Sequence, residues 1–128
     1  MRLSLVTYLV RDTDAAIAWF QDALGWIVLE DTDLGEKRWV RVAPDAKADT
    51  ALLIAQASTD AQVFAIGTAN AGRVSYFLEV EDFDAAATHL NAHGALFEEE
   101  PRRESYGRVA VFRDPLGYRC VLIEPSRV

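Results

Sequence analysis

VRDTDAA (residues 10–16) and VEDFDAA (residues 80–86) are two copies of one pattern, set seventy residues apart. A run of strand character precedes each copy, and a run of helical character follows it and ends at Gly25 or Gly94. The offset exceeds the roughly 20–50 residues of solenoid repeats, so it indicates a duplicated module rather than one unit of an array.

Both halves predict the same order of elements. The first half predicts a strand at 3–10, a helix between the N-cap Asp12 and Gly25, a strand at 26–30, a turn at 31–36, and strands at 37–42 and 51–56. The second half predicts a strand at 73–80, a helix at 84–93 after the N-cap Asp82, strands at 95–99, 108–113 and 118–124, and a polar loop at 101–107. Each half is therefore βαβββ, and the fold class is α+β.

We expect one domain over residues 1–128, because no low-complexity linker separates the halves. Module 1 covers about residues 1–56, module 2 about 73–128, and a connector of small and polar residues covers 57–72.

The charge composition limits the classes of binding partner that this protein is expected to have. Thirteen basic and 20 acidic residues give a net charge of −7, which argues against nucleic acid or an anionic membrane as a partner. Arg102, Arg103 and Arg108 are the candidate basic patch, and we interpret them as a solvated loop. Neither a signal peptide nor a spanning segment is visible, so a cytoplasmic location is expected. The single cysteine, Cys120, lies in an apolar run and is interpreted as a buried small hydrophobe.

The repeat resembles the vicinal oxygen chelate superfamily, which includes glyoxalase I, bleomycin- and fosfomycin-resistance proteins and extradiol dioxygenases. The resemblance rests on the aromatic pair Trp19-Phe20, on Leu24-Gly25-Trp26, and on the turn motif FRDPLGY at residues 112–118. It covers essentially the whole chain. It implies two tandem βαβββ modules that form paired curved mixed sheets around a concave cup. It does not imply a reaction, because this fold supports many chemistries.

The resemblance also implies four positions for metal ligands, one on the first and one on the last strand of each module. Here these positions hold Leu5, Leu52, Ser75 and Val121. Leucine and valine offer no lone pair, and a divalent metal needs at least three protein donors. We therefore expect no metal and no cofactor.

Other donors remain open. His89 and His93 stand four residues apart on one predicted helix face, a spacing that can bind zinc if a third ligand comes from elsewhere. The alternative is that both lie on the exposed side of the helix. Glu124 lies three residues beyond Val121, so strand alternation turns it to the opposite face, as a salt-bridged or solvated residue.

Strand alternation then predicts which side chains line the cup. They are largely apolar or aromatic with a few polar groups, which suits an organic ligand held by shape and a few hydrogen bonds. The predicted ligand-binding residues are Leu5, Thr7, Trp39, Arg41, Leu52, Ser75, Phe77, Glu79, Tyr106, Arg119 and Val121.

Several of these residues have a plain alternative. Trp39 and Phe77 also fit a core or a dimer interface. Glu79 is the candidate general base if it is desolvated, but a structural ion pair with Arg119 or Arg41 is favoured. Tyr106 is either a lid over the cup or an ordinary turn residue.

Two functions follow. The first is a metal-free protein that binds a small organic molecule, as a homodimer, since short open sheets leave edges that need cover. The second is a glyoxalase- or dioxygenase-type enzyme, acting as a lyase, isomerase or oxygenase, with a displaced metal or acid–base residues such as Glu79. The residues at the four ligand positions favour the first.

Overall fold

The computed structural model describes residues 1–127 and divides into two compact units, Met1–Ile66 and Gly67–Val128. Each unit is one copy of the repeat, and each is described here by itself. The predicted connector is shared between them: α2 (Asp60–Ala65) belongs to the first unit, and the second begins at Gly67.

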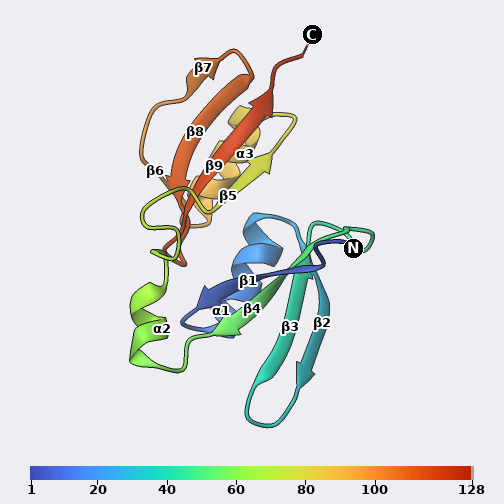
Figure 1. Ribbon diagram of the computed structural model, residues 1–128. Helices are drawn as coiled ribbons and strands as arrows, with labels where there is room; N and C mark the ends of the chain where they lie inside the picture. Colours follow the sequence, from blue (N-terminus) through green and yellow to red (C-terminus); the bar gives the residue numbers. More distant parts are fainter. Residues whose placement is uncertain (128) are drawn as a thin grey trace. The chain divides into compact units, whose positions relative to one another are not determined.

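The first unit is a four-stranded sheet with one helical segment packed on it (Figure 1). Its elements are β1 (Leu5–Val10), α1 (Thr13–Ala18) continued by a π-helical turn η1 (Trp19–Ala23), β2 (Ile27–Asp33), β3 (Arg38–Ala43) and β4 (Ala51–Gln56). The strand order is β1-β4-β3-β2, with β1 parallel to β4 and the other pairs antiparallel.

The second unit repeats this topology. Its elements are β5 (Tyr76–Glu79), α3 (Phe83–Ala92), β6 (Leu96–Phe97), β7 (Arg102–Glu104), β8 (Gly107–Arg113) and β9 (Arg119–Pro125). The order is β5-β9-β8-β6, again with a parallel first pair, and α3 lies across one face of this sheet (Figure 1). The predicted α+β fold of two βαβββ modules is confirmed.

Two differences from the predicted elements have clear causes. β2 continues through the predicted turn to Asp33, because Asp31 pairs with the Arg38 guanidinium across the hairpin. The predicted loop 101–107 contains β7, a short strand that pairs with β8 and is held by the ion pairs of Arg102 with Glu99 and Glu104. The arginines predicted to form a solvated basic loop are thus partly matched by acids.

The helices of the two repeats, α1 with η1 and α3, begin and end where the sequence predicts. The Asp12 and Asp82 carboxylates accept hydrogen bonds from first-turn amides of α1 and α3. Gly25 and Gly94 follow the helices with φ of 67° and 95°, a backbone conformation that favours glycine.

A second contact ties each helix to the last strand of its own unit. The Gln56 side chain at the end of β4 accepts from the Thr13 amide, and Glu124 in β9 accepts from the Phe83 amide. Thr13 and Phe83 are equivalent residues of the repeat, so the two units use the same device. Glu124 lies on the helix-covered face, as alternation predicts, but its role is to cap α3.

The turn after β8 is held by a buried carboxylate. Asp114 is 3% exposed; one carboxylate oxygen accepts from the backbone amides of Leu116 and Tyr118, and the other from the Tyr76 hydroxyl at 2.9 Å. Cys120 lies beside it, fully buried, and burial raises the pKa of its thiol. The thiol is therefore a protonated core group, as the sequence predicts.

Within residues 1–127, no helix has both the length and the apolar character needed to cross a membrane.

Candidate functional site

The sheet of the first unit has a helix-covered face and an opposite face, called here the open face. Residues paired across neighbouring strands direct their side chains to the same face. Tyr8, Val40 and Ile54 are at most 5% exposed and define the helix-covered face. By the same register the open face carries the predicted residues Leu5, Thr7, Trp39 and Arg41.

The register corrects one predicted site residue. Leu52 pairs with Val6 and Val42, so it shares the helix-covered face with Ile54. Leu53, which pairs with Thr7 and Arg41, faces the open side in its place. The error came from counting between the two halves, where one residue of drift inverts a strand's faces.

A β-bulge in β2 brings a further residue to the open face. Val28 pairs with Val42, but Glu30 pairs with Arg41, so Leu29 is the extra residue. In a regular strand Glu30 would share the helix-covered face with Val28. The bulge turns the carboxylate to the side of Arg41 and Trp39.

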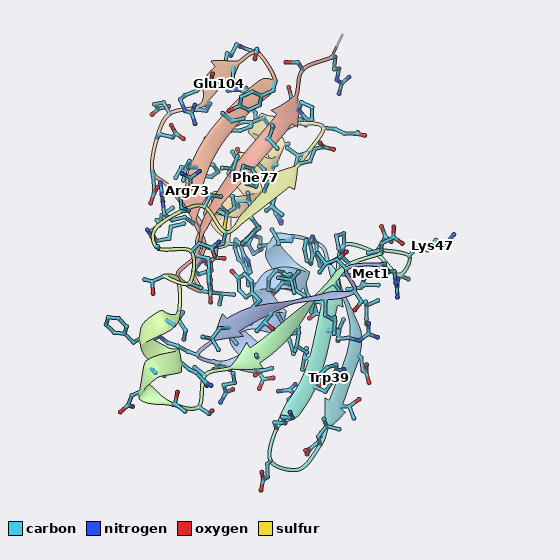
Figure 2. The ribbon with its side chains drawn as sticks, in the orientation of Figure 1. Met1, Trp39, Lys47, Arg73, Phe77 and Glu104 are labelled. Carbon is cyan, nitrogen blue, oxygen red and sulfur yellow. The ribbon has the colours of Figure 1, made fainter. Side chains whose placement is uncertain are left out.

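Glu30 is the centre of a polar cluster on this face. Its Oε1 accepts from Arg41 Nε at 3.0 Å and from Trp39 Nε1 at 3.2 Å, and its Oε2 accepts from the Thr32 hydroxyl at 3.3 Å. The pair is partly exposed, with side-chain exposure of 33% for Arg41 and 40% for Glu30. Figure 2 shows the Trp39 side chain on its strand.

These donors hold Glu30 in its charged form. The hydrogen bond from Arg41 is the largest cause that lowers the pKa of the Glu30 carboxyl, and Thr32 and Trp39 act in the same direction against some desolvation. A carboxylate with a lowered pKa is a weak base. The cluster is therefore suited to orienting groups rather than to removing protons.

The cluster borders a hollow of about 280 Å³. The hollow is lined by Arg2, Ser4, Leu5, Leu29, Glu30, Trp39, Arg41, Ala48, Asp49 and Ala51. Of the predicted ligand-binding residues, it therefore brings together Leu5, Trp39 and Arg41.

Two larger hollows, of about 580 and 360 Å³, lie in the second unit. Both are bounded by the same C-terminal segment, residues 124–127. Of the predicted ligand-binding residues, only Glu79 lines either of them. Three line the hollow of the first unit, where Trp39 and Arg41 also share Glu30 as a hydrogen-bond acceptor, so this hollow is the better candidate site.

In the second unit, alternation places the predicted residues as expected. Ser75 precedes β5 and its amide donates to the Arg119 carbonyl, while Phe77 pairs with Val121. Tyr76 and Cys120 mark the helix-covered side of the same pairs, so Phe77, Glu79 and Val121 face the open side. Phe77 is 68% exposed, and Figure 2 shows it on β5.

Both arginines that were favoured as ion-pair partners of Glu79 have carboxylate partners within their own units. Arg119 donates to Glu98 from Nε and Nη2 and to the Gly72 carbonyl from Nη1, and Arg41 pairs with Glu30. Glu79 itself is exposed on the second sheet. The partners of Arg119 lie in a turn (Gly72) and in the bend just after β6 (Glu98), whose geometry no local pattern encodes.

Tyr106 occupies the β7–β8 turn and is 57% exposed. Its carbonyl accepts from the Ser126 amide, just beyond the end of β9, whereas Ser75 and Arg119 lie at its start. β9 spans seven residues, roughly 20 Å. Tyr106 is thus a turn residue at the far end of the sheet from Ser75, and it is not placed as a lid over it.

The profile of the Glyoxalase/Bleomycin resistance protein/Dioxygenase superfamily matches residues 2–122. The chain belongs to this superfamily.

Similar proteins agree with this membership. An uncharacterized protein of Shewanella frigidimarina is 37% identical over 114 residues, which cover 88% of this chain and 84% of that protein. The crystal structure of UcmS2 superposes with a TM-score of 0.81 at 29% identity, covering 97% of this chain and 98% of that one. TnmS3, an antibiotic-binding protein from Streptomyces sp. CB03234, gives a TM-score of 0.78 at 27% identity, covering 98% and 97%.

The residues of this superfamily member do not fit the metal centre that its metal-dependent relatives imply. With the register applied, the four ligand positions hold Leu5, Leu53, Ser75 and Val121, of which only serine has a donor atom. Within residues 1–127, no group of three or more His, Cys, Asp or Glu side chains is placed to hold a metal ion.

The histidine pair does not alter this result. The His89 and His93 rings lie 4.3 Å apart between centroids, at the end of α3 and at its C-cap. Both residues are exposed, and His93 Nδ1 contacts the His89 carbonyl at 2.9 Å. No third ligand joins them among the described residues.

Sequence reasoning missed Glu30, Leu29, Arg2 and Asp49 as site residues. For Glu30 the only available signal was the single acid in an otherwise apolar strand, directly before the predicted turn. Alternation alone would have assigned it to the wrong face, because the bulge depends on pairing with β3.

Proposed function

We propose that this protein binds a small organic molecule on the open face of its first sheet, without the metal centre of its metal-dependent relatives. The observation that carries the proposal is the 280 Å³ hollow in which Leu5, Leu29 and Trp39 surround a charged pair. Ligand pockets combine mostly apolar walls with a few placed polar groups.

The chemistry of the cluster supports binding over catalysis. Glu30 is engaged by three donors and its pKa is lowered, so it is a poor general base. The enzymatic alternative requires metal donors or a desolvated acid. The ligand positions hold mainly aliphatic side chains, and Glu79 is exposed.

The similarity to TnmS3 supports the same conclusion. That protein is an antibiotic-binding protein, and its resemblance spans nearly the whole of both chains. We infer a binding role of this general kind here.

A homodimer is also proposed. β1 and β5 are edge strands of their own sheets, and Val6 and Phe77 on them are 43% and 68% exposed. Exposed apolar edges favour pairing with another chain. The cytoplasmic location and the absence of nucleic-acid or membrane partners stay predictions.

The function is tested by screening a diverse set of organic molecules for thermal stabilisation, then measuring each hit by isothermal titration calorimetry. Hits that occupy the hollow should lose roughly tenfold or more in affinity for Trp39→Ala, which removes one wall. Phe64→Ala is the matched control, because Phe64 is 85% exposed on α2 and does not line the hollow. The proposal fails if no compound stabilises the protein, or if hits bind Trp39→Ala as tightly as the original chain.

A further inference from the structure

Arg41 carries more hydrogen-bond donors than the fold uses. A guanidinium has five N–H groups in a fixed fork, and only Nε is engaged, by Glu30 at 3.0 Å. Within residues 1–127 no other hydrogen bond or ion pair to Arg41 is found, so both terminal nitrogens are without a protein partner. The side chain is 33% exposed and lines the hollow, so these donors are accessible to a ligand.

Glu30, by contrast, has little capacity left. Its two oxygens already receive Arg41, Trp39 and Thr32, and the carboxylate is held in place by all three. A cationic ligand would have to compete with these donors for Glu30. A ligand that accepts hydrogen bonds can instead use the terminal nitrogens of Arg41, where it displaces no protein acceptor.

A second guanidinium lines the same hollow. Arg2 makes one hydrogen bond, a long one of 3.4 Å to the Asp49 carbonyl, and no ion pair to it is found in the described part of the chain. Arg2 and Arg41 together balance Glu30 and Asp49, so an entering anion meets no net negative charge despite the chain's total of −7.

We propose that the hollow takes an organic carboxylate, with its two oxygens on the terminal nitrogens of Arg41 and its apolar part against Leu5, Leu29 and Trp39. The fork geometry of arginine matches a carboxylate, and charge-assisted hydrogen bonds are the stronger kind. Glu30 is then a positioning residue, since it fixes the guanidinium through Nε and leaves the other nitrogens free. This proposal rests on the proposed function and adds the chemical class of the ligand.

The test compares three ligands built on the same naphthalene ring by isothermal titration calorimetry: 2-naphthoate, the planar 2-naphthamide of matched shape, and the cationic 2-naphthylmethylamine. The acid should bind roughly tenfold or more tightly than the amide, which accepts a hydrogen bond without a charge, and the amine should bind most weakly. Equal affinity of acid and amide would overturn the carboxylate proposal and leave the proposed function standing. Binding of none of the three would overturn it too, and hits in the separate screen would then decide whether the binding function survives.

Substitutions of Arg41 test whether the preference for the acid comes from its guanidinium group. Arg41→Gln should abolish the preference for the acid while leaving the amide's affinity within about twofold, and Arg41→Lys, which keeps the charge without the fork, should recover only part of the preference. Arg38→Gln is the matched control, because Arg38 lies on the same strand but faces Asp14 and Asp31 on the helix-covered side. A preference that survives Arg41→Gln, or that Arg38→Gln removes equally, would overturn the assignment.

Discussion

At the scale of single residues, Glu30 orients the side chains of Arg41 and Trp39 by accepting a hydrogen bond from each. Without it, Arg41 and Trp39 are an arginine and an indole on a sheet face. With it, Arg41 is fixed at one nitrogen and presents the others. Glu30 therefore orients the donors of the hollow, although its own oxygens are already hydrogen-bonded to Arg41, Trp39 and Thr32.

The lowered pKa of Glu30 predicts a pH dependence. Because the folded value lies below the unfolded one, the ion pair contributes stability above the ordinary value of 4.5, and this contribution is lost as pH falls through the lowered folded value. Urea unfolding of Glu30→Gln and of the original chain should therefore differ at pH 6 and converge towards pH 3. A gap that is unchanged between these pH values would contradict the assignment.

Cys120 predicts the opposite trend at high pH. Its thiol is buried and its pKa is raised, so the folded chain keeps the proton while the unfolded chain releases it above about pH 9. The free energy of unfolding should fall as pH rises from 8 to 10, and Cys120→Ala should show a shallower fall. Equal slopes in urea unfolding would show that Cys120 does not carry this effect.

At the scale of elements, the repeat predicts its own substitutions. Gln56 and Glu124 have the same role in the two units, because each side chain accepts a hydrogen bond from the first backbone amide of its unit's helix. Glu124→Gln should therefore be tolerated within about 0.5 kcal/mol, whereas Glu124→Ala leaves the Phe83 amide unpaired and should cost about 1–2 kcal/mol. Chemical denaturation measures both, and a glutamine variant as unstable as the alanine variant would contradict the equivalence.

The sequence predicts an element well when local residues determine it, and poorly when contacts with distant segments determine it. Alternation and helical period are local, so β1, β4, α3 and the faces of Thr7 and Phe77 were predicted correctly. The bulge at Leu29, the strand β7 and the partners of Arg119 depend on contacts between segments distant in sequence. The cluster was therefore predicted only in part: Arg41 and Trp39 were found, and the carboxylate that orients them was not.

At the scale of the whole molecule, the exposed edge strands predict association. Light scattering should give a solution mass of twice the 14.2 kDa of one chain. Phe77→Lys should shift the protein towards the monomer, because a charge replaces a side chain that is 68% exposed on β5. Phe64→Lys, at another exposed phenylalanine outside the sheets, should leave the mass unchanged. A chain that is monomeric without substitution would contradict the proposed dimer.

The parallel pairing of first and last strands bears on the order in which the chain acquires its structure during synthesis. β1 cannot gain its neighbour until the ribosome has delivered Ala51–Gln56, and β5 waits in the same way for Arg119–Pro125. Each sheet is therefore complete only when its final strand has emerged. The first sheet can be completed while the second is still being made. Every residue that lines the hollow lies between Arg2 and Ala51, so the whole lining is available once Ala51–Gln56 has left the ribosome, before β9 is needed.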